Sequence, residues 1–194
     1  MAEPLAVCLH AARRGPSLLG AKVLVTGCGP IGALAILVAR YGGAAEIVAT
    51  DVSAYPLSLA QRLGASRTVN VAEDPGGLTP YTADKGTFDV LFEASGNEAA
   101  LRGALDAMRP GGIVVQLGLG GEMRLPINTI VAKELQLRGA FRFDEEFRLA
   151  VALMGAGLVD VKPVLTETLP FERATDAFDL ASDRSRAIKV QLAF

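Results

Sequence analysis

Residues that bind metals through nitrogen or sulfur are scarce in this sequence, which has one histidine and two cysteines among its 194 residues. A zinc site, whether structural or catalytic, needs several such ligands held close together. His and Cys alone therefore cannot complete a zinc site in this chain. Cys8 and Cys28 are also too few for a disulfide framework, which predicts a reduced protein in the cytoplasm.

An excess of positive charge and a long apolar run are absent as well. The 19 Lys and Arg residues stand against 21 Asp and Glu residues, and the formal net charge of −2 argues against nucleic acid and anionic membrane as main partners. The N-terminus lacks the basic stretch of a secretory signal. The most apolar window, residues 33–39, is far shorter than the roughly 20 residues that span a bilayer. We therefore expect no membrane partner.

The chain does contain a regular alternation of apolar runs and helical patterns, with 51% hydrophobic residues and 21 glycines. Strands that are apolar on both faces, separated by helices of about ten residues, predict βαβ units and a parallel sheet covered on both sides. With right-handed crossovers they predict an α/β fold, a doubly wound, six-stranded Rossmann sheet in the order 3-2-1-4-5-6. The predicted strands are Lys22–Thr26, Glu46–Asp51, Arg67–Asn70, Phe88–Glu93, 112–117 and 135–141, and the predicted helices are Pro30–Tyr41, Ala54–Leu63, 98–108 and 145–154.

Both ends of the chain fall outside this module. A helix over residues 5–13 precedes the first strand. Residues 157–194 hold several prolines, a helix near 171–180 and an alternating strand at 187–194. We therefore expect three parts: residues 1–15 as the edge of a second domain with a linking helix, 16–156 as the Rossmann domain, and 157–194 as a segment that returns to the second domain.

A glycine-rich turn follows the first predicted strand directly. It reads GCGPIG over residues 27–32 and opens a helical pattern, so G-x-G-x-x-G stands between strand and helix as dinucleotide binding requires. Gly27 permits the tight turn, Gly29 lets the backbone approach a pyrophosphate, and Gly32 lets the helix pack closely on the strand. Pro30 suits the first turn of a helix, whose free N–H groups and positive dipole end face the phosphates.

An acidic residue ends the second predicted strand. Asp51 lies 22 residues beyond Gly29, close to the spacing of about 20 in dinucleotide-binding folds. A carboxylate there accepts hydrogen bonds from the adenosine ribose hydroxyls and repels a 2′-phosphate. No Lys or Arg follows until Arg62, so NAD is favoured over NADP. The alternative is an ordinary glycine turn, with Asp51 capping the next helix.

Two further strand ends point to the same crevice. Ser95 and Gly96 follow the fourth predicted strand, and Leu117 and Gly118 follow the fifth. Small residues at the carboxyl ends of parallel strands leave room for a bound ribose and nicotinamide. Ordinary loop glycines are the alternative.

Other patterns carry weaker hypotheses. Tyr81 and Lys85 have the Y-x-x-x-K spacing of short-chain dehydrogenases, but they follow Pro80 in a predicted loop, which disfavours a catalytic role. A methyltransferase would also use a glycine turn and an acidic residue after the second strand, and the third glycine argues against it without excluding it. His10, on the first predicted helix, is expected to pack or lie on the surface.

Several stretches together resemble the zinc-dependent medium-chain dehydrogenases of the polyol branch, and the resemblance extends over essentially the whole chain. They are residues 3–7 (EPLAV), 27–32 (GCGPIG), 51–53 (DVS), 92–96 (FEASG) and 133–143 (KELQLRGAFRF). The resemblance implies an NAD-dependent oxidoreductase that acts on the secondary alcohol of a small sugar acid or polyol. It further implies cofactor contacts at Ile31 and Phe141, and a homodimer or homotetramer.

The resemblance also implies a zinc ion that is bound mainly outside this chain, in a GroES-like catalytic domain of the full-length enzyme. Glu3 matches the carboxylate that lies next to this zinc, as a ligand or through its water, so the metal site here is incomplete. Arg142 matches the arginine that pairs with that carboxylate and faces the substrate. Where many members carry an arginine soon after the strand-two acid, this chain has Tyr55 and Pro56, which again favours NAD. A self-standing, non-catalytic nucleotide-binding module remains the alternative.

Overall fold

The computed structural model describes residues 1–194 and has a six-stranded parallel sheet at its centre. Its strands lie in the order β3-β2-β1-β4-β5-β6, which confirms the predicted doubly wound α/β fold. The order reverses between β1 and β4, and a switch point of this kind is where such folds bind ligands. The strands are β1 (Lys22–Thr26), β2 (Glu46–Asp51), β3 (Arg67–Asn70), β4 (Phe88–Glu93), β5 (Met108–Gln116) and β6 (Gln136–Gly139).

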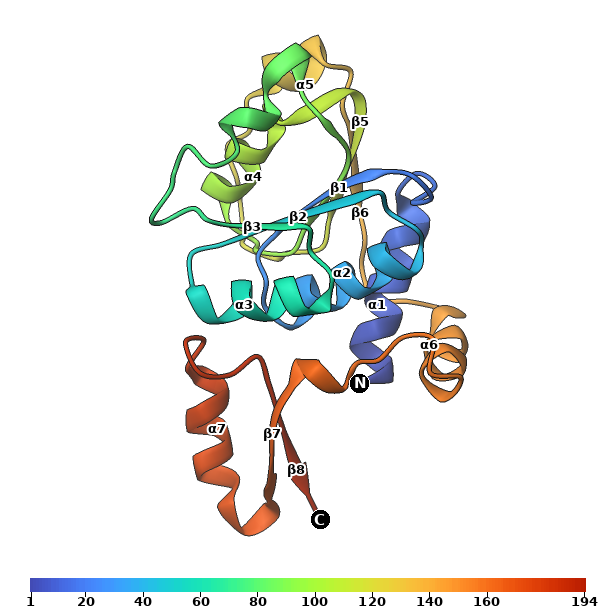
Figure 1. Cartoon of the computed structure of the whole chain (residues 1–194), viewed down its shortest axis with the longest axis vertical. Helices are drawn as coiled ribbons and strands as arrows, with labels where there is room; N and C mark the ends of the chain where they lie inside the picture. The colour runs from blue at the N-terminus through green and yellow to red at the C-terminus, as the bar shows by residue number, and fades with distance from the viewer.

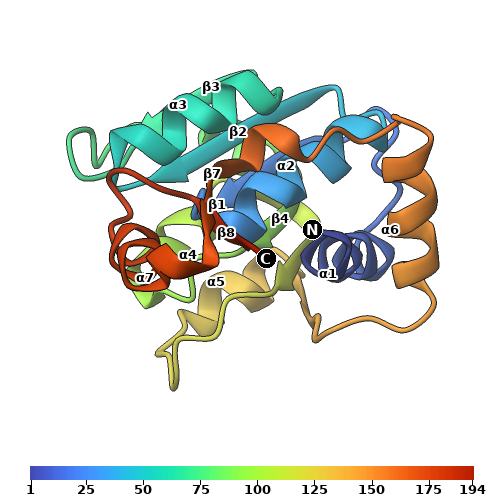
Figure 2. The same ribbon diagram turned by 90° about the horizontal axis from the view of Figure 1, so that it is seen from below.

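Helices cover both faces of the sheet (Figure 1 and Figure 2). One face packs against α1, α2, α3 and α6, and the other against α4 and α5. The helices are α1 (Ala2–Arg14), α2 (Pro30–Tyr41), α3 (Ala54–Leu63), α4 (Glu98–Leu105), α5 (Ile127–Ala132), α6 (Glu146–Gly155) and α7 (Ala174–Ser182).

The hydrophobic core is split by the sheet into two clusters. In β1, Val23 and Val25 belong to the larger cluster and Leu24 to the smaller one on the opposite face. Phe92 and Leu91 divide in the same way in β4. Burying each such side chain contributes about 2 kcal/mol, and burial on both faces explains why these strands read as continuous apolar runs.

The observed elements differ from the predicted ones where tertiary contacts override local pattern. The helix predicted over 98–108 ends at Leu105, because Met108 pairs with Phe88 as the first residue of β5. The Nζ atom of Lys133 donates to the carbonyl oxygens of Leu105, Asp106 and Met108, where the chain passes from α4 into β5. The strand predicted over 135–141 is shorter, and α5 and β7 (Leu165–Pro170) were not predicted.

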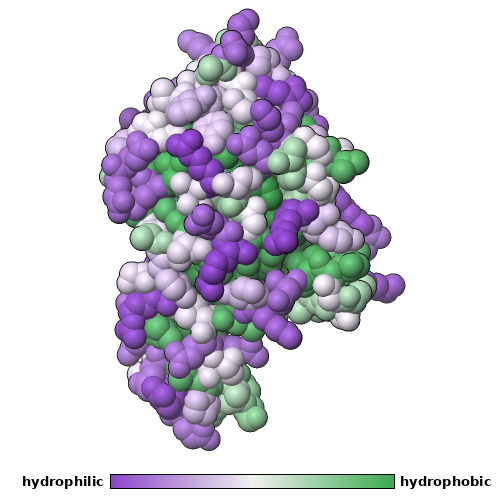
Figure 3. All heavy atoms as spheres, viewed as in Figure 1, coloured by the Kyte–Doolittle hydropathy of each residue, from purple (hydrophilic) through white to green (hydrophobic).

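The C-terminal residues form a small unit of their own. β7 pairs in parallel with β8 (Lys189–Ala193), and Figure 1 shows this pair and α7 at the lower end, apart from the six-stranded sheet. The rings of Phe171 and Phe194 stack with centroids 5.0 Å apart, and both are exposed. Figure 3 shows apolar side chains in green at this end of the molecule. Nowhere in the fold does a helix have the length and apolar character that crossing a membrane requires.

Candidate cofactor site

The glycine turn lies where β1 ends and α2 begins, and two of its glycines are required by packing. Gly27 has φ +82°, and a Cβ atom on it would lie 2.8 Å from the backbone nitrogen of Ser95. A Cβ atom on Gly32 would lie 1.7 Å from the carbonyl oxygen of Gly27. By contrast, a Cβ atom on Gly29 would meet nothing within 4 Å. The turn is therefore closed on its protein side and open at Gly29.

The first turn of α2 points its free backbone N–H groups at this open side. Gly29 is the N-cap and carries no side chain that could satisfy them, and Pro30 occupies the first turn. Unpaired N–H groups and the positive end of a helix dipole bind phosphate oxygens well. The open side at Gly29 leaves room for a pyrophosphate, and the role of Gly29 in binding it stays a prediction.

Asp51 joins the end of β2 to the glycine turn. Its Oδ2 atom accepts a hydrogen bond from the backbone nitrogen of Cys28 at 2.7 Å, and its Oδ1 atom accepts one from Ser53 at 3.0 Å. The carboxylate is half-buried and lies at the carboxyl edge of the sheet beside the turn. Two backbone bonds fix its position, and carboxylate oxygens accept more than one bond each. The arrangement suits recognition of vicinal hydroxyls.

Both cysteines are free, buried thiols. Burial, and to a lesser extent the Asp51 charge, raises the pKa of the Cys28 thiol well above its ordinary value. Burial likewise raises the pKa of Cys8, with a smaller effect of Glu3. Neither thiol therefore supplies a thiolate for nucleophilic chemistry near the turn.

The loops after β4 and β5 pack against each other at the same edge. A Cβ atom on Gly118 would lie 2.1 Å from the backbone nitrogen of Gly96, and a Cβ atom on Gly120 would lie 1.6 Å from the carbonyl oxygen of Gly96. Gly96 itself has φ +64°. These glycines are thus needed for contact between the two loops. This requirement is separate from the predicted one, that small residues leave room for a ligand.

A buried carboxylate that the sequence analysis did not single out lies beneath these loops. Glu93, the last residue of β4, is completely buried. Its neighbours in the sheet are Thr26 at the end of β1 and Gln116 at the end of β5. Side chains in the same register on adjacent strands meet, so three polar side chains form a row across the switch point. The signal in the sequence is a polar residue that follows a run of apolar residues at the end of each of the three strands.

Every hydrogen bond of the Glu93 carboxylate comes from this edge of the sheet. Its Oε1 atom accepts from Thr26 Oγ1 at 3.3 Å, from the Ser95 backbone at 2.9 Å and from the Ser95 hydroxyl. The Gly96 backbone nitrogen lies 3.2 and 3.1 Å from its two oxygens. Oε2 also accepts from Gln116 Nε2, which donates in addition to the Gly118 carbonyl at 2.8 Å.

The two residues predicted to face the zinc and the substrate lie on different elements. Glu3 is exposed in the first turn of α1, and Arg142 is exposed in the connection between β6 and α6. The ion pairs of the structure do not include one between them. The guanidinium of Arg142 instead lies 5.2 Å from the centroid of the exposed Phe141 ring, and its φ of +58° is unusual for a residue other than glycine. Their proposed roles rest on the resemblance.

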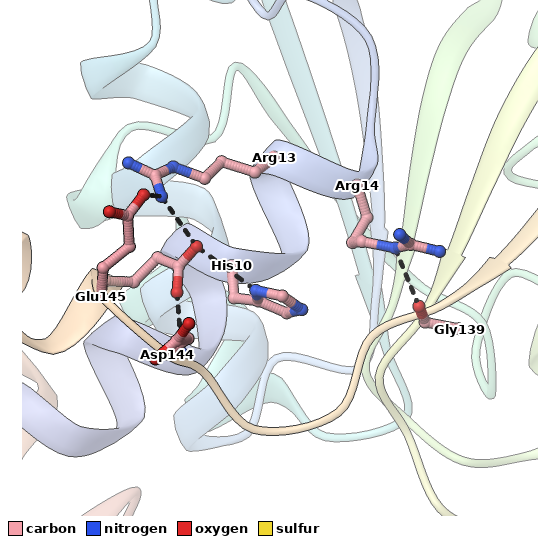
Figure 4. A network of polar contacts seen from close by, with 7 residues as sticks. His10, Arg13, Arg14, Gly139, Asp144 and Glu145 are labelled. Atoms are coloured by element: carbon pink, nitrogen blue, oxygen red, sulfur yellow. Dashed lines mark hydrogen bonds and ion pairs between the residues drawn. The ribbon is translucent and has the colours of Figure 1, made fainter.

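A polar network fastens the segment that carries Arg142 to α1 (Figure 4). His10 Nδ1 lies 3.3 Å from Oε1 of the buried Glu146, and Arg13 donates to the same oxygen at 3.0 Å and also binds Glu145. Burial raises the pKa of Glu146, but backbone N–H groups of Asp144 and Glu146 and the His10 side chain outweigh it and lower the value to about 2. His10 therefore belongs to a structural network.

The end of α1 is fastened to β6 in the same region. Arg14 Nε donates to the Gly139 carbonyl at 3.3 Å, and Arg138 donates to the Arg14 carbonyl at 2.6 Å. Figure 4 shows the Arg14 contact beside the His10 network. The loop after β6, with Phe141 and Arg142, is thus held at both of its ends by contacts to α1.

The Y-x-x-x-K pair lies away from the glycine turn. The Tyr81 hydroxyl donates to Glu46, the first residue of β2, whereas the turn adjoins the last residue of that strand. Lys85 is exposed in a short 3-10 helix. This placement agrees with the expectation that the pair has no catalytic role at the cofactor site.

No three His, Cys, Asp or Glu side chains come together in a group that could hold a metal ion. The donor set that zinc needs is therefore not assembled among the residues of this chain, Glu3 included.

Comparisons with known proteins agree with this geometry. Residues 30–156 match the family described as zinc-binding dehydrogenase. The whole chain is 42% identical to the L-idonate 5-dehydrogenase (NAD(P)(+)) of Escherichia coli K12, over 56% of that protein. It is 38% identical to human sorbitol dehydrogenase over 181 residues, which are 91% of this chain and 51% of that protein.

Solved structures show the same relationship. The crystal structure of the Escherichia coli L-idonate 5-dehydrogenase superposes with a TM-score of 0.94, covering 100% of this chain and 56% of that one. The 2R,3R-butanediol dehydrogenase of Bacillus subtilis superposes with a TM-score of 0.90 at 27% identity, with the same coverage of 100% and 56%. The chain spans about half the length of these relatives. It belongs to the zinc-binding dehydrogenase family, of which it contains the NAD(P)-binding Rossmann portion.

Proposed function

We propose that this chain is the NAD-binding portion of a zinc-dependent dehydrogenase that oxidises L-idonate to 5-ketogluconate. The observation that carries the proposal is the open face of Gly29 beside the fixed carboxylate of Asp51. The identity of 42% to an L-idonate 5-dehydrogenase over the whole chain supports this substrate class. A polyol of the sorbitol or xylitol type is the second candidate, supported by the identity of 38% to a sorbitol dehydrogenase.

The residues around the turn take separate roles in this proposal. Gly29, Pro30 and Ile31 hold the pyrophosphate at the start of α2, where unpaired N–H groups favour anions. Gly27 and Gly32 shape the turn through the close contacts described above. Asp51 accepts hydrogen bonds from the adenosine ribose hydroxyls.

The nicotinamide half lies over the ends of β4 and β5 in this proposal. Ser95, Gly96, Leu117 and Gly118 line it, and Phe141 approaches from the loop after β6. NAD, when bound, supplies the acceptor for the hydride that leaves the alcohol carbon. The residues of this chain bind and orient it.

Zinc enters the proposal only through residues outside this sequence, because the side chains present do not form a site for it. Glu3 would face that metal and Arg142 the substrate. The proposal keeps the three parts of the chain: residues 1–15 as the edge of the second domain, 16–156 as the Rossmann domain and 157–194 as the segment that returns to the second domain. Because no metal site is assembled here, this chain is proposed to bind NAD weakly and to catalyse nothing alone. We place the protein in the cytoplasm, in keeping with its two free thiols. A homodimer or homotetramer is proposed from the family resemblance alone.

The preference for NAD follows from charge. A 2′-phosphate about 5 Å from the Asp51 carboxylate would be repelled by about 1–3 kcal/mol at effective dielectric constants of about 80 to 20. This energy corresponds to about fivefold to 150-fold weaker binding of NADPH than of NADH.

Calorimetric titration with NADH and NADPH tests both the site and its specificity. Asp51→Asn keeps the size of the side chain and removes its charge, so it should bring the two affinities together. Asp179→Asn, at an exposed position of α7, is the matched control and should leave the ratio unchanged. Equal affinity of the unaltered chain for both cofactors, or a preference for NADPH, contradicts the role of Asp51. A chain that binds neither NADH nor NADPH contradicts the proposal itself. The alternative of a non-catalytic nucleotide-binding module predicts that the cofactor binds but that no alcohol is oxidised, even when the catalytic domain is present.

A further inference from the structure

The Glu93 carboxylate has features that core packing alone does not explain. Burying a carboxylate costs free energy unless hydrogen bonds replace its hydration. No Lys, Arg or His side chain donates to Glu93, so its partners are the hydroxyls, amide and backbone N–H groups described above. A leucine of similar volume would fill the same space at the end of β4, after the apolar run Val90–Phe92, without that cost.

We propose that Glu93 is a positioning residue for the nicotinamide half of the cofactor. Its carboxylate holds the loops after β4 and β5 in the shape that receives this half, and the inference rests on the proposed function. Its two oxygens accept the backbone N–H groups of Ser95 and Gly96, which therefore turn inward, and the chain doubles back over the carboxylate. Gly96 accordingly adopts φ +64°.

The same carboxylate reaches the second loop through one side chain. Gln116 Nε2 bridges Glu93 to the Gly118 carbonyl. The backbone nitrogens of Leu117 and Gly118 also donate to the Glu93 carbonyl oxygen, at 2.9 and 2.8 Å. Because the two loops touch at Gly96 and Gly118, a shift in one displaces the other. One residue therefore sets the geometry of both loops.

The adenosine half of the proposed site is built from other contacts. Asp51 is held by backbone groups of Cys28 and Ser53, and neither of them bonds to Glu93. The links to β1 and its glycine turn are the bond from Thr26 and the close packing of Gly27 against Ser95. Loss of the Glu93 carboxylate should therefore act unequally on the two halves of the cofactor.

Glu93→Gln tests the inference, because it keeps the size of the side chain but replaces one acceptor oxygen by an NH₂ group. That NH₂ group cannot accept from the N–H and O–H donors that surround the carboxylate. Calorimetric titration uses NADH and AMP as probes, since AMP contains adenine, ribose and phosphate but no nicotinamide. The dissociation constant for NADH should rise about tenfold while that for AMP changes by less than about twofold, as expected for a lost charge-assisted bond. Thermal unfolding of each variant is measured alongside.

A matched control lies on the same strand. Asp89 is the second residue of β4, at the other end of the strand from Glu93, and it accepts from the Lys22 backbone at 2.7 Å and from Arg109. Asp89→Asn also removes a hydrogen-bonded carboxylate, but it should leave the ratio of NADH to AMP affinity unchanged. Gln116→Met is the second variant should Glu93→Gln not fold, and it should weaken NADH binding about threefold or more with AMP unaffected.

The outcomes separate the inference from the proposed function. Equal losses for NADH and AMP in Glu93→Gln and Gln116→Met, or no loss for either probe, overturn the positioning role. Failure of the unaltered chain to bind NADH or AMP overturns the proposed function, and the inference with it. A selective loss for NADH, with a melting temperature no lower than that of Asp89→Asn, supports the role of Glu93.

Discussion

Replacing Gly29 by alanine should separate cofactor binding from folding. Gly29 has φ −63° and ψ −169°, an extended conformation that any residue adopts, and its Cβ would meet nothing within 4 Å. Alanine is a poorer N-cap than glycine, but it also lowers the entropy of the unfolded chain, which offsets a comparable free energy. These small effects oppose each other, so we expect the free energy of unfolding to change by less than about 0.5 kcal/mol.

The binding of the cofactor should respond very differently. The added methyl group occupies the side of the turn at which the pyrophosphate is proposed to approach. A hydrogen bond to a charged phosphate oxygen contributes about 1.5–3 kcal/mol. Losing one such bond lowers the affinity for NADH about tenfold to hundredfold. Calorimetric titration measures this loss, and thermal unfolding of the same samples shows that the fold is intact.

Gly32→Ala is the control because it damages the turn itself. Its Cβ would lie 1.7 Å from the Gly27 carbonyl oxygen and 2.8 Å from the carbonyl carbon, so α2 must move away from β1. Overpacking of this kind costs about 1–3 kcal/mol, and each kcal/mol lowers the melting temperature by roughly 2–4 °C in a chain of this size. Binding and stability should fall together. The reasoning fails if Gly29→Ala binds NADH as tightly as the unaltered chain, or if it melts as early as Gly32→Ala.

Two further predictions concern the contacts that hold the scaffold. The pKa of Glu146 is lowered from 4.5 to about 2, so its contribution to the free energy of unfolding is complete above pH 4.5 and is lost as the pH falls through about 2. Melting temperatures measured across that range should decline less steeply in Glu146→Gln, and parallel curves would contradict this. Lys133→Met keeps the aliphatic stem but removes three bonds to carbonyl oxygens at the junction of α4 and β5, which should cost about 2 kcal/mol in urea unfolding. Lys162→Met, at an exposed position, should be neutral, and an equal loss in both variants would refute the role of Lys133.

Much of the fold could be predicted because its signals are local. The apolar runs of β1 to β4 and the helices α2 and α3 have the predicted bounds, since periodicity and turn residues lie within each segment. The glycine turn and Asp51 could be identified for the same reason, as two features at a characteristic spacing. Weak local signals failed: α5 has six residues and none of them is buried, so it carries no amphipathic pattern.

The row of Thr26, Glu93 and Gln116 depends instead on the pairing of three strands that are far apart in the chain. Each residue alone is an ordinary polar strand end, and only the order β1-β4-β5 and the register make them neighbours. The need for glycine at 96, 118 and 120 likewise arises from the approach of two loops. The residues of one segment were sufficient to indicate a nucleotide-binding turn. How the loops beside that turn are held was decided by tertiary structure, because the hydrogen bonds of a buried carboxylate come from whichever strands surround it.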